Sequence, residues 1–163
     1  MIRKGFFIAC FILTLGTAGA QTHGYPGQGF MLRQRPFYVD ALNFPAIDST
    51  GISTHLDVYV KIPYDIISFV IDDGRYTGGY MLTARIKRSD NSLIKEATWR
   101  RALVKKTFEE TRGKDKYDVS MYRFTLDPDD IILEVNFEDN ESENEYTLSQ
   151  TLKVRRYDPN LVG

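Results

Sequence analysis

Apolar and polar residues alternate along much of the chain, and a period of two is typical of a β-strand that is buried on one face. A strong example lies at residues 55–62, where four aliphatic residues alternate with polar ones until Pro63 ends the run. Residues 76–88 form the longest alternating segment, with one apolar face and one polar face. The residues predicted to share the buried faces of these two segments are Leu56, Val58, Val60, Ile62, Tyr76, Gly78, Tyr80, Leu82, Ala84 and Ile86.

Further segments complete the inventory of strands. Residues 37–44 follow Pro36, which suits the start or the edge of a strand, and residues 66–71 end at an Asp-Asp-Gly turn. Later strands are predicted at residues 93–104, 122–126, 131–137 and 146–154. Seven or eight short strands without an amphipathic helix predict an all-β fold, an immunoglobulin-like antiparallel β-sandwich.

Three places leave the local structure open. The pair Gly78-Gly79 suggests a bulge or a bend within the longest strand. In residues 93–104 the apolar residues occupy both parities, and a bulge near Trp99 would reconcile them. Residues 108–116 are highly charged, which is compatible with a single helical turn or with an open loop.

The first twenty residues follow a different pattern. Arg3 and Lys4 precede an unbroken apolar run at residues 5–15, and small residues at 18–20 come before Gln21. The run is too short to span a bilayer, and the whole segment is typical of a cleavable secretory signal peptide. The expected organisation is a signal peptide at 1–20, a mobile leader at 21–35, the β-sandwich at 36–156 and a C-terminal tail at 157–163.

The cysteine content of the chain is consistent with an exported protein. The only cysteine, Cys10, lies inside the predicted signal peptide, so the mature protein would contain neither a thiol nor a disulfide. The apolar residues that follow Cys10 argue against its being the lipidated cysteine of a lipoprotein. The expected location is therefore periplasmic, envelope-associated or extracellular.

The net charge and the length of the mature chain limit the classes of partner that we expect it to bind. Removal of the signal peptide takes two of the 21 basic residues, which leaves 19 against 22 acidic residues and a net charge of −3. A chain with this balance is not expected to bind nucleic acid or an anionic membrane surface. No apolar run after residue 20 reaches the length of a transmembrane helix. The remaining 143 of the 163 residues suffice for one domain whose core needs no metal or covalent staple.

Several short segments carry a family resemblance. Residues 37–40 read Phe-Tyr-Val-Asp, and residues 56–64 read Leu-Asp-Val-Tyr-Val-Lys-Ile-Pro-Tyr, with Phe69 following. Residues 110–112 read Glu-Thr-Arg, and a Leu-x-Pro turn at 126–128 precedes a strand that ends at Asp139. On these residues the chain resembles the N-terminal β-sandwich region of secreted bacterial GWxTD domain-containing proteins, over roughly residues 36–155. The resemblance implies a secreted or cell-envelope location and carries over no catalytic residues.

Two features depart from that family pattern. Asp129 and Ile131 stand where such domains often have glycine and tyrosine, so this corner would be built differently. The GWxTD segment itself is absent. We therefore expect either a stand-alone version of the sandwich or the front piece of a longer protein whose activity lies in a missing C-terminal part.

The residue inventory argues against an enzyme. A catalytic relay needs a base held on a rigid frame. The two histidines are His23, in the predicted leader, and His55, on the polar face of a predicted strand. A zinc site needs three or four convergent ligands, and no segment has that spacing. We predict no catalytic residues and no cofactor.

Two further hypotheses concern ligands. Acidic turns supply the oxygen ligands that calcium prefers, and the best cluster is Asp127, Asp129 and Asp130, although turns favour such residues in any case. Tyr59 and Tyr64 lie on or just past the polar face of residues 55–62 and are candidates for an exposed aromatic platform.

The sequence thus predicts an exported, non-catalytic β-sandwich that either binds another envelope or secreted protein through a sheet face or an exposed edge strand, or supports a larger assembly. Two alternatives stay open. One is a carbohydrate-binding module that uses Tyr59 and Tyr64, and the other is the front fragment of a larger protein.

Overall fold

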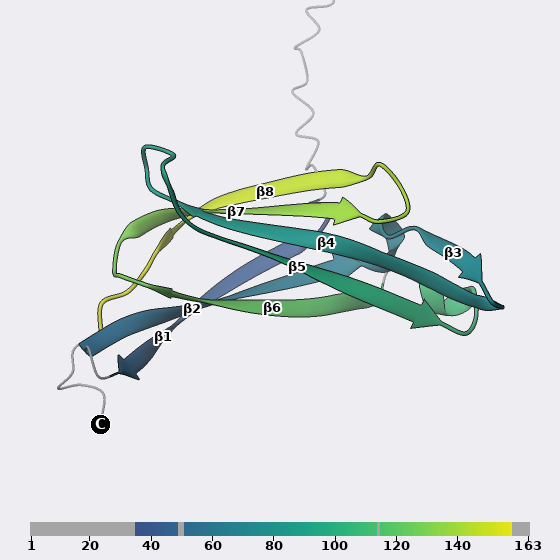
Figure 1. The fold of residues 1–163 in the computed structure, drawn as a ribbon, viewed down its shortest axis with the longest axis horizontal. Coiled ribbons are helices and arrows are strands. Elements are labelled where there is room, and N and C mark those ends of the chain that lie inside the picture. The colour runs from purple at the N-terminus through teal and green to yellow at the C-terminus, as the bar shows by residue number, and fades with distance from the viewer. Residues whose placement is uncertain (1–34, 49–50, 114, 158–163) are drawn as a thin grey trace, which may run out of the picture. The chain divides into compact units, whose positions relative to one another are not determined.

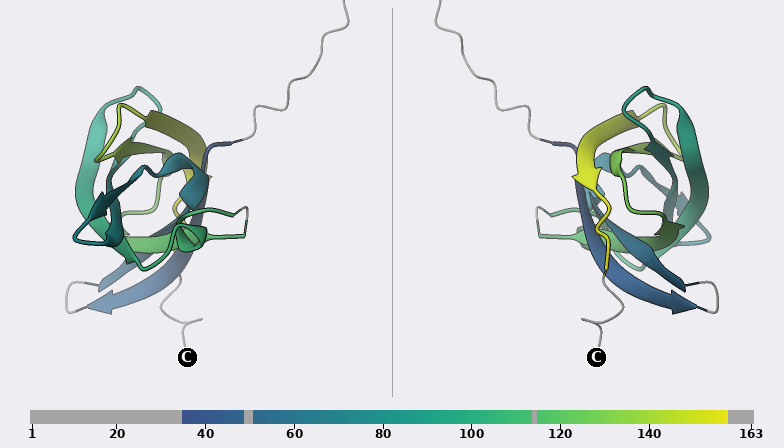
Figure 2. Two further views of the ribbon diagram at one scale, coloured as in Figure 1. Left: turned by 90° about the vertical axis from the view of Figure 1, so that its right-hand side faces the viewer. Right: turned by 90° about the vertical axis from the view of Figure 1, so that its left-hand side faces the viewer.

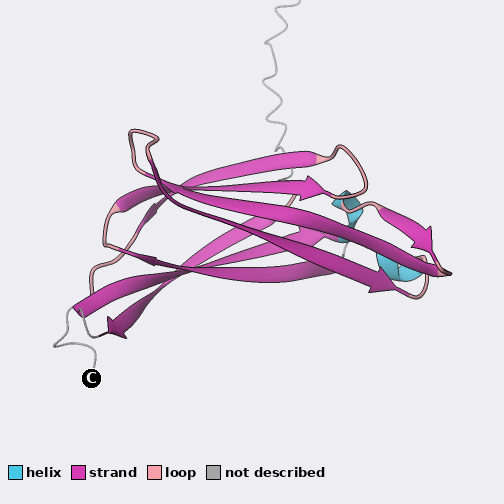
Figure 3. Ribbon diagram, viewed as in Figure 1, coloured by secondary structure: helices cyan, strands magenta, loops and turns pink. Residues whose placement is uncertain are grey.

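The computed structural model describes residues 35–48, 51–113 and 115–157, and these residues form an all-β domain (Figures 1 and 3). The strands are β1 (Tyr38–Asp48), β2 (Gly51–Pro63), β3 (Phe69–Asp72), β4 (Arg75–Lys87), β5 (Leu93–Lys105), β6 (Tyr117–Leu126), β7 (Asp130–Asp139) and β8 (Glu145–Lys153). Two short 3-10 helices, η1 (Tyr64–Ile66) and η2 (Glu109–Thr111), follow β2 and β5. The predicted signal peptide and all but the last residue of the predicted leader lie outside the described residues.

The strands form two antiparallel sheets in a sandwich-like arrangement. The smaller sheet has the order β1-β2-β6. In the larger sheet, β4 pairs with β5 along one edge and with β7 along the other, and β8 lies beyond β7. The short β3 pairs with the start of β4, on the same edge as β7. Figure 2 shows the strands of both sheets surrounding a common interior. The prediction of seven or eight strands is confirmed by eight.

The alternating pattern correctly predicted the side chains that fill this interior. In β2, Leu56, Val58, Val60 and Ile62 are 0% exposed, and in β4 the same is true of Tyr80, Leu82, Ala84 and Ile86. Strand β7 contributes Ile131, Leu133, Val135 and Phe137. The Phe137 ring packs against Tyr80 at 5.5 Å and against Phe37 at 6.1 Å between ring centroids. Burial of apolar side chains from both sheets against each other is the main stabilising term of the domain.

The pair Gly78-Gly79 does not form the predicted bulge. The register of β4 with β5 runs unbroken through both glycines. Instead, the glycines lie where the other edge of β4 changes partner, from β3 at Gly78 to β7 at Tyr80. A Cβ atom at Gly78 would lie 2.6 Å from the backbone oxygen of Ser68, and one at Gly79 would lie 2.6 Å from that of Arg101. Glycine is therefore required by close backbone approach.

The bulge predicted near Trp99 lies elsewhere. Trp99 pairs regularly with Leu82, and the register shifts only where Ile86 pairs with Lys95 and Lys87 pairs with Leu93, which leaves Ile94 as the extra residue. Beyond this bulge the odd-numbered residues of β5 face inward, as the burial of Ala97 and Leu103 indicates. The charged segment 108–116 contains η2, so the alternative of a single helical turn is the correct one.

A polar cluster joins β5 of the larger sheet to β6 of the smaller sheet. The Tyr80 hydroxyl donates a hydrogen bond of 2.6 Å to Asp118, and the Arg101 guanidinium donates two more to the same carboxylate at 2.9 and 3.1 Å. Burial acts to raise the pKa of Asp118, but the hydrogen bonds from Arg101 and Tyr80 outweigh it and lower that pKa. Burial and the neighbouring carboxylate raise the pKa of Tyr80 well above its usual range.

We predict that Gly79→Ala lowers the free energy of unfolding by about 1–3 kcal/mol, because the added methyl group forces the backbones of β4 and β5 apart. Urea denaturation followed by circular dichroism measures the change. Ser149→Ala, at an exposed position of β8, is the control and should change stability by less than about 0.5 kcal/mol. Equal effects of the two substitutions would contradict the close-approach argument.

For the polar cluster, Asp118→Ala should cost about 1–3 kcal/mol, since it leaves the buried Tyr80 hydroxyl without its acceptor. Tyr80→Phe should cost only about 0.5–1.5 kcal/mol, because Asp118 keeps both hydrogen bonds from Arg101. Both values come from urea denaturation at neutral pH. A larger loss of unfolding free energy for Tyr80→Phe than for Asp118→Ala would contradict this explanation.

Candidate interaction face

The outer faces of the two sheets differ in chemistry. The outer face of the larger sheet is mainly polar apart from Val70 and Val104 at one end, and several of its charged side chains pair with one another. Arg85 contacts Glu96 at 2.6 Å, Lys87 contacts Glu134 at 2.8 Å, and the hydroxyls of Thr83 and Thr98 lie 3.0 Å apart. Several polar groups of this face therefore already have partners within the sheet.

The outer face of the smaller sheet carries large apolar side chains, and we call it the exposed face. Its positions alternate with the buried residues of β2 and with the inward residues of β1 and β6. Six of its side chains are between 41% and 57% exposed, namely Tyr38, Leu42, Phe44, Tyr117, Val119 and Met121. Such a group of exposed apolar side chains on one sheet face makes it a candidate binding surface.

The strand register orders the exposed face into rows across β1, β2 and β6. Three rows are Tyr38-Lys61-Val119, Asp40-Tyr59-Met121 and Leu42-Asp57-Arg123, and the fourth is Phe44-His55-Thr125. Each row has one polar or aromatic residue of β2 at its centre and at least one apolar residue at its side. The apolar side chains thus surround a central line of polar groups.

Lys61 lies between two tyrosines at one end of the exposed face. Its ammonium nitrogen lies 3.7 Å from the ring centroid of Tyr117 and 6.0 Å from that of Tyr38. Both distances fall within the range of cation–π attraction. One face of the Tyr117 ring is therefore already covered by a cation.

Asp57 and Arg123 form an ion pair in the middle of the exposed face. The guanidinium donates two hydrogen bonds, of 2.6 and 2.7 Å, to the two carboxylate oxygens. The Asp57 side chain is only 2% exposed, whereas that of Arg123 is 51% exposed and covers it. The hydrogen bonds from Arg123 lower the pKa of Asp57 against the opposing effect of burial.

His55 lies beside this ion pair but does not form a catalytic relay with it. Its Nδ1 atom is 3.1 Å from the hydroxyl of Thr125. Both oxygens of the nearby Asp57 carboxylate are bound by Arg123, so this carboxylate does not orient the imidazole. The arrangement lacks the base-orienting contact that a relay requires.

The two tyrosines proposed for ligand binding lie in different environments. Tyr59 is half-buried at the centre of the exposed face, between Asp40 and Met121. Tyr64, in η1, is only 8% exposed and belongs to the core cluster, where its ring packs edge-on against Phe69 at 5.7 Å. The structure therefore does not combine them into one exposed aromatic platform.

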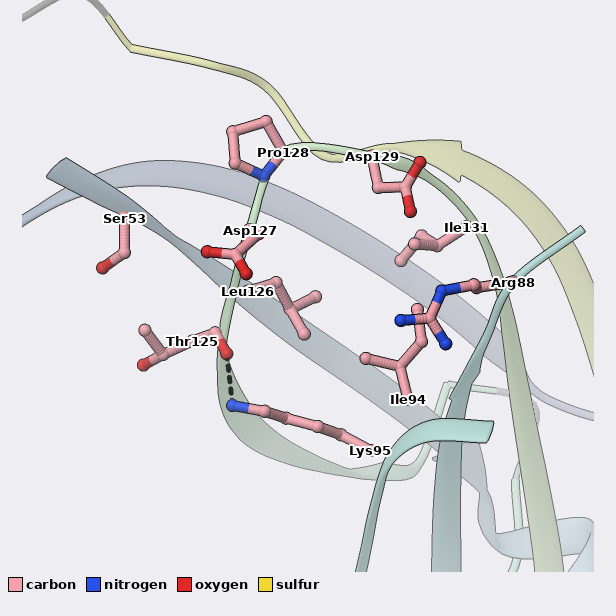
Figure 4. Close-up of a pocket in the computed structure, with 10 residues that line it drawn as sticks. All are labelled: Ser53, Arg88, Ile94, Lys95, Thr125, Leu126, Asp127, Pro128, Asp129 and Ile131. Atoms are coloured by element: carbon pink, nitrogen blue, oxygen red, sulfur yellow. Dashed lines mark hydrogen bonds between the residues drawn. The ribbon is translucent and has the colours of Figure 1, made fainter. Parts of the chain in front are cut away.

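The calcium candidates lie around the β6–β7 turn. Asp127 and Asp129 line a cavity of about 430 Å³, into which the Arg88 guanidinium also points (Figure 4). Asp130 does not line this cavity, and one oxygen of Asp129 accepts the backbone N–H of Asp130 at 2.8 Å. Within residues 35–48, 51–113 and 115–157 there is no group of three or more acidic, histidine or cysteine side chains arranged to hold a metal ion.

The outer edge of β1 is occupied by the chain's own groups. The carboxylate of Asp40 accepts the backbone N–H of Ala41 at 2.9 Å. Asn43 donates its side-chain amide to the Lys153 carbonyl and accepts the N–H of Arg155, while the Asn43 carbonyl accepts the Tyr157 hydroxyl at 2.8 Å. Native sheets protect edges against pairing with other chains in this way.

Most apolar residues of the exposed face were not among the predicted site residues. The strand predicted at residues 122–126 is the second half of β6, and its Phe124 and Leu126 are buried. The odd-numbered Tyr117, Val119 and Met121 are also apolar, and this second apolar parity was the available signal. A strand with apolar residues on both faces has either two buried faces or one face that binds a partner.

No family model matches this chain, and no curated protein matches it at a significant level. Among the described residues there is no helix long and apolar enough to cross a membrane.

We predict that Arg123→Met raises the pKa of Asp57, which can be measured by NMR titration of its carboxyl carbon. A lowered pKa in the folded state contributes stability above about pH 4, and this contribution is lost as the pH falls through the folded-state value. Arg123→Met should therefore cost roughly 1–3 kcal/mol near neutral pH, and the difference from the wild-type protein should narrow below about pH 4.

Arg100→Met, at an exposed position of β5 on the other sheet, is the matched control and should leave the pKa of Asp57 unchanged. A stability difference for Arg123→Met that stays constant from pH 7 to pH 3 would show that the ion pair does not hold the carboxylate as described.

Proposed function

We propose that this protein is an exported, non-catalytic interaction module that binds another secreted or envelope protein through the exposed face. The observation that supports this most directly is the contrast between the two outer faces. One is mainly polar, with paired charges and the exposed apolar residues Val70 and Val104 at one end, and the other presents six exposed apolar or aromatic side chains together. A larger concentration of exposed apolar side chains on one face of a small domain favours a binding surface there.

The size of the exposed face suits a protein partner. Three strands spaced about 4.8 Å apart and ten paired residues at about 3.4 Å each give an area on the order of 450–500 Å², before side-chain relief is counted. Accessible area exceeds such a flat projection, so the value approaches the roughly 800 Å² that each partner buries in a stable interface. Tyrosine, phenylalanine, methionine and arginine, the residue types enriched in interfaces, are all present on this face.

In the smaller sheet, the exposed face is a better binding surface than either edge strand. The outer edge of β1 is occupied by Asp40 and Asn43 and by the chain near Tyr157. On the outer edge of β6, the Lys95 ammonium donates a hydrogen bond of 2.5 Å to the Thr125 carbonyl. Addition of a partner strand would have to displace these groups, whereas the exposed face needs no such rearrangement.

We also propose that the domain is an immunoglobulin-like sandwich. In that plan one sheet contains strands A, B and E, and the other contains C, F and G, with an additional C′ strand in some members. The orders β1-β2-β6 and β5-β4-β7-β8 correspond to A-B-E and C′-C-F-G, with β3 as an added short strand. This plan, the predicted signal peptide and the resemblance to the sandwich region of GWxTD proteins together support an exported module.

The carbohydrate-binding alternative has less support from the geometry. Sugars stack on the open faces of aromatic rings, but one face of Tyr117 lies under Lys61 at 3.7 Å. Tyr64 lies under Lys105, with 4.7 Å from the ammonium nitrogen to the ring centroid, and its ring is otherwise buried. Tyr59 is half-buried between its neighbours. The described face therefore favours a protein partner over a sugar.

Site-specific photo-crosslinking in the producing cells tests this proposal. We predict that benzoylphenylalanine at Met121, on the exposed face, gives one heavier adduct with another protein, whereas the same probe at Arg100 on the larger sheet does not. Val119→Ser with Tyr38→Ser should reduce the Met121 adduct at least about tenfold, because it removes two exposed anchors.

The matched control is Val70→Ser with Ile71→Ser, which removes two exposed apolar side chains of β3 that lie outside the exposed face. It should leave the adduct unchanged. Equal adducts from Met121 and Arg100, no adduct from either position, or an adduct with twice the mass of the chain would each contradict the proposal.

A further inference from the structure

A recess rich in lysine adjoins one end of the exposed face. It has a volume of about 530 Å³ and lies between the end of β5, the segment after η2 and the start of β6. Its lining residues are Tyr64, Val104, Lys105, Lys106, Glu110, Asp115, Lys116 and Tyr117. We call it the lysine recess.

The lysine recess is positively charged within a chain that is slightly acidic overall. Three lysines and two carboxylates line it, which gives a local charge of +1, against −1 for the whole chain. The Glu110 carboxylate accepts the backbone N–H of Lys106 at 2.8 Å, and this hydrogen bond lowers its pKa. None of the three lysines forms an ion pair with a carboxylate among the described residues.

Two of the three lysines are positioned by uncharged groups, although the Glu110 carboxylate interacts electrostatically with Lys105 and Lys106. The Lys105 ammonium lies over the Tyr64 ring at 4.7 Å, and the Lys116 ammonium donates to the Glu109 carbonyl. The side chains of Lys105 and Lys116 are partly buried, which removes part of their hydration. Partial desolvation of a cation next to a recess favours binding of an anionic group there.

The recess is continuous with the exposed face through Tyr117. This residue lines the recess and is also one of the six exposed side chains of the face. Its ring carries the Lys61 ammonium, which places a fourth cation at the boundary. A molecule that covers the exposed face therefore meets positive charge at this end.

We propose that the lysine recess receives Asp or Glu side chains of the partner protein that covers the exposed face. The inference rests on the proposed function and adds the chemistry of the partner: an apolar contact surface flanked by an acidic segment. Charge complementarity at the recess would mainly raise the association rate and fix the orientation of the partner, while the apolar side chains supply affinity.

NMR titration of the purified protein with a capped tetraglutamate peptide tests the recess directly. We expect the amide signals of Lys105, Lys106 and Lys116 to shift, and Lys105→Gln with Lys106→Gln to weaken binding about five- to tenfold. Raising the salt concentration from about 0.05 to 0.5 M should weaken binding by the wild-type protein, since the Debye length falls several-fold. The matched control, Lys95→Gln with Lys153→Gln, removes two cations outside the recess and should leave binding unchanged.

Equal weakening by both double variants would mean non-specific attraction and would overturn the proposal. The same holds if oligogalacturonate binds the recess and tetraglutamate does not, because the ligand would then be an acidic sugar. Lys116→Gln is an independent variant in case Lys105→Gln disturbs the packing of Tyr64, and it should also weaken tetraglutamate binding.

Crosslinking separates the failure of this inference from that of the proposed function. If the Met121 adduct forms equally fast in the Lys105→Gln, Lys106→Gln variant, the partner binds the face without using the recess, and only the inference fails. If no adduct forms in the wild-type protein, the proposed function fails whatever the tetraglutamate titration gives.

Discussion

The structure depends on burial of the apolar side chains of two unequal sheets against a single interior. Polar atoms inside such an interior need partners, and Asp118 supplies them where β5 meets β6. It binds the hydroxyl of Tyr80 from one strand of the larger sheet and the guanidinium of Arg101 from the next. Tyr80 is fully buried, yet its hydroxyl reaches the carboxylate. The cluster thus lets an aromatic ring fill the core while the two sheets are held together at this edge.

The shared interior covers only one face of each sheet. The chemistry of the outer faces is therefore free to differ between the two sheets. On the larger sheet, ion pairs such as Arg85–Glu96 and Lys87–Glu134 complete a polar surface. On the smaller sheet, apolar side chains surround the Asp57–Arg123 pair. Exposed ion pairs contribute little to stability. The Asp57 carboxylate, however, is buried and bound by Arg123 through two hydrogen bonds, so the positions of these two charges on the face are fixed. A partner would therefore meet a preorganised surface, with additional positive charge at the lysine recess.

Much of the fold could be predicted from local pattern because a strand has a period of two. Leu56, Val58, Val60 and Ile62 were correctly assigned to the core from alternation alone. The predictions that were wrong concern contacts between distant segments. Gly78 and Gly79 are required by backbone oxygens of Ser68 and Arg101, and the bulge of β5 lies at Ile94 because of its register with β4. The alternating apolar residues Tyr117, Val119 and Met121 could be seen in the sequence. Whether they would be buried or exposed depended on which face of β6 packs against the core.

The sequence by itself determined the all-β class, the positions of most strands and the apolar face of each clearly alternating strand, since these follow from hydrophobic period and turn chemistry over a few neighbouring residues. It also determined that histidine and cysteine are scarce, because composition is independent of folding. The tertiary structure alone decided that Tyr64 is buried while Tyr59 is only half-buried, and that Asp57 lies under Arg123. It also brought Lys105, Lys106 and Lys116 together with Tyr117 around one recess. These features arise from strand pairing between residues far apart in the chain, and pairing partners are fixed only when both sheets close on a common interior.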